Sequence, residues 1–90
     1  MSRLSLKIFG QVQGVNFRYF VYNQAIKLNI VGWVKNAADG IVEAVLEGKE
    51  EDLKKMLESC YQGPSYAKVD KIEEQWSEGI GEFKEFKIKY

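Results

Sequence analysis

The stretch from Gly10 to Arg18 combines residue types that can bind an oxyanion. Its glycines, Gly10 and Gly14, let the backbone turn tightly and approach a ligand closely. An apolar run precedes the stretch and an amphipathic run follows it, so we expect a strand to end here and a helix to begin. The start of a helix offers unpaired N–H groups and a positive dipole end. Since Arg18 adds planar donors that suit phosphate or carboxylate oxygens, the sequence predicts an anion-binding loop with one cation.

The spacing of these glycines does not match two familiar nucleotide-binding loops. No Gly-Lys-Ser/Thr sequence follows them, as a Walker loop requires, and Gly10 to Gly14 lacks the G-x-G-x-x-G spacing of a dinucleotide fingerprint. Nucleotide hydrolysis with Mg²⁺ is therefore poorly supported. The alternative interpretation of the loop is a glycine-containing turn with a surface arginine that binds nothing.

Asn36 is the second candidate for chemistry, because it directly follows the β-rich run of residues 30–35 and precedes a predicted turn. An asparagine at such a place often stabilises the turn through local hydrogen bonds. Its uncharged amide both donates and accepts, so it can also hold and orient a water molecule. The residue type alone leaves both interpretations open.

The amino-acid composition narrows the chemistry that these residues can perform. The 90 residues include no histidine and one cysteine, Cys60. Without histidine there is no histidine acid–base catalysis, no Ser-His or Cys-His nucleophile pair and no histidine-containing zinc site. One cysteine cannot form a cysteine-only metal site within one chain. We therefore expect no metal and no cofactor, and a function that depends on arginine, lysine, asparagine, carboxylates and backbone.

The charge balance gives no electrostatic footprint for nucleic acid or an anionic membrane, because thirteen basic and thirteen acidic residues cancel. The N-terminal sequence lacks the apolar run of a signal peptide, and no run reaches the ~18 apolar residues of a membrane span. A single cysteine suits a reducing compartment. We expect a cytoplasmic protein, monomeric by default, with neither nucleic acid nor membrane as partner and with one domain over residues 1–90.

Hydrophobic periodicity predicts the elements that must position the candidate residues. Asn16 is a candidate cap for the first helix, and Asn29 a candidate end for it. The Asp39-Gly40 pair predicts a turn between two strands. The two helices are expected over about 17–28 and 49–62, and the strands over about 3–10, 30–35, 41–47, 69–76 and 86–90.

The resulting order, βαββαβ with a terminal strand, predicts an α+β fold. Two helices should cover one face of a mainly antiparallel sheet of four to five strands, the ferredoxin-like sandwich. The strand over 41–47 is apolar on both faces and should be central, while imperfect alternation over 69–76 indicates a bulge. We expect Trp33 and Trp76 in the core, together with a helical stripe of Leu53, Met56, Leu57 and Cys60. This fold hosts many functions and does not choose among them.

Two motifs resemble, in order, the signature patterns of the acylphosphatase family. The first is Gly10-x-Val12-Gln13-Gly14-Val15-x-Phe17-Arg18. The second is Gly32-Trp33-Val34-Lys35-Asn36-x-x-x-Gly40-x-Val42, followed by Gly48. The motifs together span about residues 10–48, and the closing sequence Phe86-Lys87-Ile88-Lys89-Tyr90 resembles the last strand of the family.

This resemblance implies an enzyme that hydrolyses small acyl phosphates to a carboxylate and inorganic phosphate. Arg18 would bind the phosphoryl group, Asn36 would position the attacking water, and inorganic phosphate or sulfate would bind as a product-like ligand. The backbone groups that would help to bind the phosphoryl group are those of Gln13, Gly14, Val15, Asn16, Phe17 and Arg18. The sequence departs from the family at Asn16, where members often carry glycine or another small or apolar residue, and at Ala37, where some carry a hydroxyl.

The chemistry of an acyl phosphate explains why so few groups would be enough. Its leaving group is a carboxylate with a pKa near ~4, which needs no general acid at neutral pH. Phosphoryl transfer through a loose transition state requires mainly positioning and charge stabilisation. A loop, one arginine and one amide can supply both, whereas alkyl phosphate esters have far more basic leaving groups. A phosphoryl oxygen of the substrate is a candidate acceptor for the proton of the water.

The main alternative is a ferredoxin-like module that binds an anion or small ligand without catalysis. An RNA-binding module of this kind needs aromatic residues on its central strands, and residues 41–47 contain none. A small-ligand sensor, or a similar module within a larger assembly, fits the sequence better than an RNA-binding domain. The domain-sized chain favours a free-standing enzyme. Turnover of an acyl phosphate would distinguish the enzyme from a binding module without catalysis.

Overall fold

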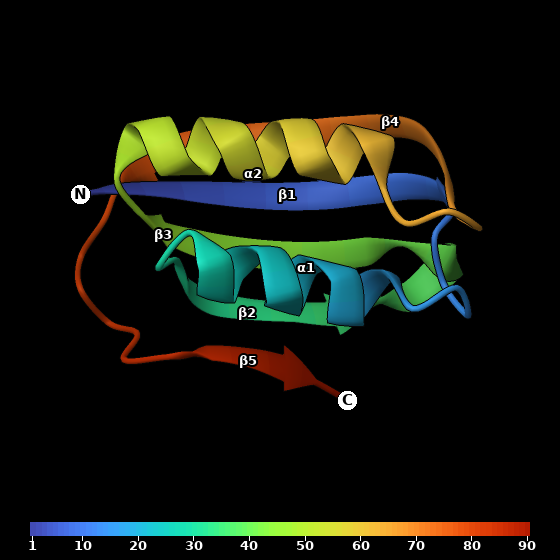
Figure 1. The fold of residues 1–90 in the computed structure, drawn as a ribbon, viewed down its shortest axis with the longest axis horizontal. Coiled ribbons are helices and arrows are strands. Elements are labelled where there is room, and N and C mark those ends of the chain that lie inside the picture. Colours follow the sequence, from blue (N-terminus) through green and yellow to red (C-terminus); the bar gives the residue numbers. More distant parts are fainter.

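The computed structural model describes residues 1–90, which form five strands and two helices (Figure 1). A short 3₁₀ turn, η1 (Ala38–Gly40), lies between the second and third strands. The elements follow one another as β1 (Ser2–Gln11), α1 (Phe17–Lys27), β2 (Val31–Asn36), β3 (Val42–Gly48), α2 (Glu50–Gln62), β4 (Lys68–Glu78) and β5 (Phe86–Lys89). All the expected helices and strands are present, and the largest shift of a boundary is at the end of β4.

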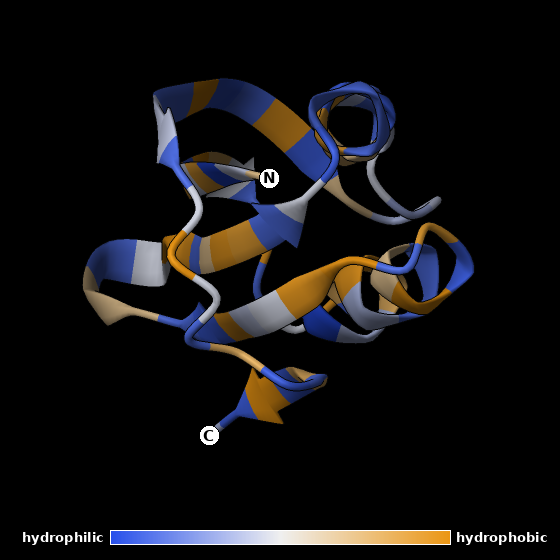
Figure 2. Ribbon diagram, turned by 90° about the vertical axis from the view of Figure 1, so that its left-hand side faces the viewer, coloured by the Kyte–Doolittle hydropathy of each residue, from blue (hydrophilic) through white to orange (hydrophobic).

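The five strands form one sheet in the order β4-β1-β3-β2-β5. β1 pairs antiparallel with both β3 and β4, and β2 pairs antiparallel with β3, whereas β5 runs parallel to β2. Both helices lie on the same side of this sheet (Figure 2). The structure confirms the ferredoxin-like sandwich and the central position of β3, and it adds a parallel edge strand.

A buried core fills the space between the sheet and the helices. The inward-facing residues of β1, namely Leu4, Leu6 and Ile8, are buried as their alternation predicts. Burying each of these side chains stabilises the fold by about 1.5–3 kcal/mol. The helices contribute Phe17, Val21, Ala25, Leu53, Met56 and Cys60. Neither helix is long and apolar enough to cross a membrane.

The prediction that both tryptophans are core residues is wrong. Val34 faces the helices and is buried, so strand alternation places Trp33 on the side of the sheet that no helix covers. There Trp33 is half-buried, with the ammonium of Lys89 4.6 Å from its ring centroid. Trp76 faces the helix layer beside Leu4, but β4 is an edge strand and the side chain remains 38% exposed.

The residues that begin and end α1 have unusual backbone conformations. Asn16 is left-handed, with φ 62° and ψ 26°, and its side chain makes no capping hydrogen bond. The expected side-chain cap is therefore wrong, because such a cap requires a residue in the extended region. Asn29 is also left-handed, with φ 56°, and directly follows the last turn as predicted. Asp39 and Gly40 have φ 62° and 77°, in agreement with the predicted turn.

The predicted bulge lies where β1 ends and the loop begins. The register of β1 and β4 shifts between Phe9 and Gly10, which leaves Asp70 as the extra residue on β4. Gly10 has φ +133°, and a Cβ there would lie 2.1 Å from the carbonyl oxygen of Lys68. Only glycine allows β1 and β4 to approach this closely at the bulge, which bends the strand pair just before the loop.

A buried carboxylate fixes the connection between β4 and β5. Glu47 is fully buried at the end of the sheet far from the Gly10–Arg18 loop, and it accepts hydrogen bonds from Arg3 Nε at 2.9 Å, Ile80 N–H at 3.1 Å and Gly81 N–H at 3.2 Å. Burial acts to raise the pKa of this carboxyl, but the hydrogen bonds from Ile80 and Arg3 outweigh it and leave the pKa below its ordinary value. The sequence does not reveal this group, because Glu47 lies on the helix-free face of β3, where only the connection between β4 and β5 buries it.

Candidate active site

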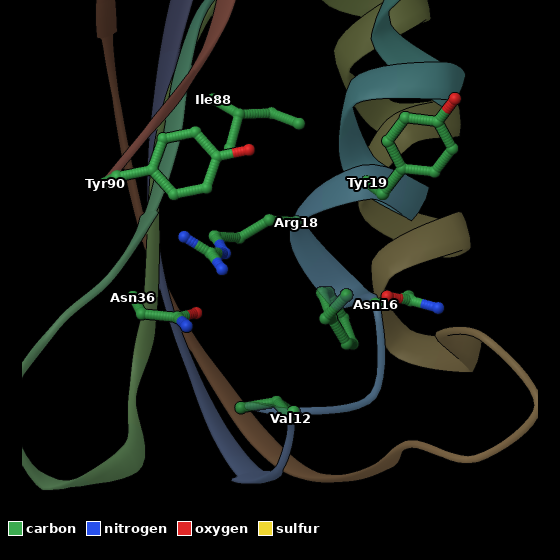
Figure 3. A pocket seen from close by; sticks show the side chains of 9 residues that line it. Val12, Asn16, Arg18, Tyr19, Asn36, Ile88 and Tyr90 are labelled. Carbon is green, nitrogen blue, oxygen red and sulfur yellow. The ribbon is translucent and has the colours of Figure 1, made fainter.

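A cavity of about 320 Å³ lies at the end of the sheet where β1 and β2 finish (Figure 3). The start of α1 forms one wall, and the ends of β2 and β5 form the other. Its lining residues are Val12, Gly14, Asn16, Phe17, Arg18, Tyr19, Asn36, Ile88 and Tyr90. Arg18 has the only positively charged side chain among them.

The structure brings together most of the residues that the sequence analysis selected. Arg18 and Asn36 come from different elements and point towards one another across the cavity (Figure 3). Gly14, Asn16 and Phe17 also line it. Gln13 and Val15 belong to the same loop but are not among the lining residues.

The loop between β1 and α1 is held at both ends by buried side chains. Val12 and Phe17 are each 1% exposed and are part of the core. Between them the backbone is left-handed at Gly14, with φ 75°, and at Asn16. A left-handed position disfavours most side chains but admits glycine and, at lower cost than others, asparagine. Asparagine is therefore tolerated at position 16, where the backbone is left-handed.

The start of α1 presents a series of free backbone donors. The N–H of Phe20 donates to the carbonyl oxygen of Asn16 at 3.0 Å, while the N–H groups of residues 14–19 donate to no backbone carbonyl. No acidic side chain occupies the first turn of the helix to neutralise them. A Cβ added at Gly14 would meet nothing within 4 Å, so the backbone is accessible there. The positive end of the helix and these donors together favour an anion.

Arg18 is the second residue of α1 and extends towards the sheet. Its Nη1 donates to the carbonyl oxygen of Lys89 at 3.3 Å, and its guanidinium carbon lies 4.8 Å from the ring centroid of Tyr90. Both contacts are with β5 or the residue after it, and both are exposed to solvent. Because a guanidinium has five N–H donors, one bond to Lys89 leaves the others free for a ligand.

Asn36 is the last residue of β2 and pairs with Val42 of β3. Its Oδ1 is buried and has no hydrogen-bond partner. Leaving such an acceptor unpaired costs about 1–3 kcal/mol, and groups of this kind are rare in folded proteins. The amide is thus fixed by its backbone rather than by side-chain hydrogen bonds.

Gln13 and the rim of the cavity were assigned no side-chain role in the sequence analysis. The Gln13 amide Nε2 donates to the carbonyl oxygens of Ala37 and Ile41, both at 2.9 Å. Tyr19, Ile88 and Tyr90 form an apolar rim beside Arg18. The alternation of the last strand could have placed Ile88 and Tyr90 on one face with Phe86, but no sequence signal indicated which loop this face would meet.

Comparison with known proteins decides the family. The family model described as acylphosphatase matches residues 4–88. An acylphosphatase from Roseiflexus sp. (strain RS-1) is 44% identical over 88 residues, which are 98% of this chain and 95% of the relative. The chain belongs to the acylphosphatase family. It is therefore a hydrolase of the family whose members act on small acyl phosphates.

Solved acylphosphatase structures have the same fold. The crystal structure of acylphosphatase from Bacillus subtilis has a TM-score of 0.96 and 39% identity to this chain, with 100% of both chains covered. Full-length HypF in a phosphate- and nucleotide-bound form has a TM-score of 0.90 and 37% identity, but the match covers 99% of this chain and only 12% of HypF. The acylphosphatase fold therefore occurs both alone and as a small part of a longer protein.

Proposed function

We propose that the cavity between α1 and β2 is the site where this acylphosphatase hydrolyses the carboxyl–phosphate bond. The backbone N–H groups of residues 13–18 and the Arg18 guanidinium hold the phosphoryl group, and Asn36 positions the attacking water. One observation supports this proposal above the others. Free backbone donors, one cation and an amide without a partner line the same cavity although they come from separate elements.

In the proposed reaction, the water oxygen attacks phosphorus and the bond from phosphorus to the carboxyl oxygen breaks. The electron pair of that bond leaves with the carboxylate, and the water proton passes to a phosphoryl oxygen. A carboxylate with a pKa near ~4 leaves without protonation. No general acid is required, in keeping with a sequence that has no histidine. The product phosphate, or sulfate in its place, is the expected ligand of the same donors.

The loop donors and Arg18 stabilise the negative charge of the transition state. In a loose phosphoryl transition state this charge is spread over three equatorial oxygens. Donors that are fixed before the reaction stabilise this charge without reorganising. Left-handed Gly14 and Asn16, together with buried Val12 and Phe17, keep the loop in one shape. Tyr19 and Ile88 form a rim on which a small acyl group can rest while its phosphate reaches Arg18.

The other properties that we propose follow from the sequence. The protein acts in the cytoplasm as a monomer, residues 1–90 form a single acylphosphatase domain, and activity requires no metal, cofactor, nucleic acid or membrane.

The experiment that tests the proposed mechanism is hydrolysis of benzoyl phosphate by Asn36→Ala. We expect kcat to fall by about 10²-fold, because the water loses its orientation, while inhibition by inorganic phosphate changes by less than threefold. Asn23 is exposed on α1, so Asn23→Ala is the matched control and should behave as the parent protein.

Two results would contradict this assignment. An unchanged kcat in Asn36→Ala would remove Asn36 from the mechanism, and a collapse of phosphate affinity in a folded variant would make it a binding residue. Phenyl phosphate provides a second arm, since its phenol leaving group has a pKa near ~10. The parent protein should hydrolyse it far more slowly than benzoyl phosphate, and comparable rates would contradict a mechanism without a general acid.

A further inference from the structure

We infer that the Gln13 side chain is a positioning residue that joins the phosphate-binding loop to the hairpin that carries Asn36. This inference rests on the proposed function of the cavity and assigns a role to a side chain that does not line it. Gln13 follows the buried anchor Val12 and precedes Gly14, which lines the cavity. Its side chain leaves the loop and reaches the connection between β2 and β3.

The two hydrogen bonds of the Gln13 amide bridge the mouth of the hairpin. Nε2 donates to the carbonyl oxygen of Ala37 and to that of Ile41, each at 2.9 Å. Ala37 N–H also donates to the Ile41 carbonyl oxygen at 2.7 Å. Asn36 and Val42 form the last pair of the β2–β3 ladder, and Ala37 and Ile41 are the next residues beyond that pair. Both protons of the Gln13 amide nitrogen are therefore donated directly beside Asn36.

Asn36 depends on this support because its own amide lacks a partner. Its Oδ1 is buried without a hydrogen bond, so no side chain fixes its direction. Beyond Asn36 the chain enters η1, whose three residues Ala38, Asp39 and Gly40 are exposed. Asn36 thus lies between the β2–β3 ladder and an exposed turn. The hydrogen bonds from the Gln13 side chain support the backbone at this point, where β2 ends.

The loop side of the link is equally well defined. Val12 and Phe17 are buried at either end of the loop, and the free N–H groups of residues 14–19 follow directly after Gln13. The Gln13 amide thus sets the distance between the loop N–H groups, which bind the phosphoryl group, and the Asn36 amide, which positions the water. Attack requires the reacting atoms to be about 3–3.5 Å apart, and an error of ~1 Å can reduce the rate by ~10².

The test compares Gln13→Met with the matched control Gln11→Met. Methionine keeps the length of the side chain but donates no hydrogen bond, and Gln11 is an exposed glutamine two residues earlier. With benzoyl phosphate we expect Gln13→Met to lower kcat by about 10- to 100-fold. Inhibition by inorganic phosphate should change by less than threefold, because the loop donors and Arg18 are retained. Gln11→Met should match the parent protein in both measurements.

A double-mutant cycle separates positioning of Asn36 from a general effect on structure. If Gln13 acts through Asn36, Gln13→Met should lower kcat in the parent protein and cause little further loss in Asn36→Ala. Equal losses in the two backgrounds would overturn the inference, since they would show that Gln13 acts independently of Asn36. A parent-like kcat in folded Gln13→Met would overturn it as well.

A second variant keeps the test decisive where Gln13→Met does not fold. Gln13→Asn keeps the amide but shortens the side chain by one methylene, so it cannot reach Ala37 and Ile41 as Gln13 does, and it should show the same fall in kcat relative to Gln11→Asn. The Arg18→Ala and Asn36→Ala variants distinguish failure of the proposed function of the cavity from failure of the role assigned to Gln13. Parent-like activity in those two variants overturns the proposed function itself, whereas their inactivation beside a fully active Gln13→Asn overturns only the role of Gln13.

Discussion

Replacing Arg18 by alanine removes the only positively charged side chain that lines the cavity. The guanidinium donates one hydrogen bond to the carbonyl oxygen of Lys89, and its other N–H groups can donate to a phosphoryl group. Two unit charges about 4 Å apart interact by about 4 kcal/mol at an effective dielectric constant of ~20. A loss of that size corresponds to a rate decrease of about 10³-fold. Loss of a single oxyanion donor in other enzymes gives a similar range of ~10²–10³.

The assay for this prediction is steady-state hydrolysis of benzoyl phosphate, with inorganic phosphate as competing ligand. Arg18→Ala should lower kcat/KM by about 10³-fold and weaken phosphate binding markedly. Arg18→Lys keeps the charge but loses the planar set of donors, so its kcat/KM should lie between that of Arg18→Ala and that of the parent protein. Lys27→Ala removes an exposed cation from the far end of α1 and is the matched control.

The fold is not expected to suffer in Arg18→Ala, because the contacts of Arg18 with Lys89 and Tyr90 are exposed. An exposed cation–π contact contributes only ~0.5–1 kcal/mol. A folded Arg18→Ala that hydrolyses benzoyl phosphate at nearly the parent rate would refute the reasoning. Equal loss of activity in Lys27→Ala would also do so, since the effect would then not be local to the cavity.

Three further predictions concern the fold that supports the cavity. Asn16 is left-handed, so Asn16→Ala should lower the free energy of unfolding by about 1 kcal/mol in urea denaturation, whereas Asn16→Gly should leave it nearly unchanged; equal losses would contradict this. The Glu47 carboxyl has a pKa below its ordinary value of 4.5, so its ionised form stabilises the fold above that pH and the stabilisation is lost as the pH falls through the native pKa. Thermal melting points of Glu47→Gln should therefore decline less on acidification than those of the parent. Burial raises the pKa of Cys60 to about 12, so a disulfide reagent at pH 8 should leave the native thiol unmodified and label it in guanidinium chloride; rapid labelling of the native protein would show that the α2 interface opens readily.

Periodicity made most of the fold predictable from the sequence. Leu53, Met56 and Cys60 recur at helical spacing and are buried on α2, and Leu4, Leu6 and Ile8 alternate on β1. The same method failed for Trp33 and Trp76 because hydrophobicity does not tell which face of a sheet is covered or which strand lies at an edge. The parallel pairing of β5 with β2 depends on long-range contacts, which local patterns do not contain.

The residues of the candidate site were predictable as types, and their mutual placement was not. Gly14, Arg18 and Asn36 were selected from two motifs, and the structure places all three at one cavity. The side-chain link from Gln13 to Ala37 and Ile41 spans more than twenty residues of sequence and has no local signature. The buried carboxylate of Glu47 was missed for the same reason, since its partners Arg3, Ile80 and Gly81 are distant in the chain.

The most direct measurement of the central claim is a titration of the ¹⁵N-labelled protein with inorganic phosphate, followed on its backbone amide resonances. If the free N–H groups of the loop and the start of α1 hold the phosphoryl group, the largest shifts should occur at residues 13–18, with smaller ones at Asn36, and Arg18→Ala should weaken them. Largest shifts on the helix-free face around Trp33 and Lys87, with residues 13–18 unmoved, would contradict the assignment of this cavity.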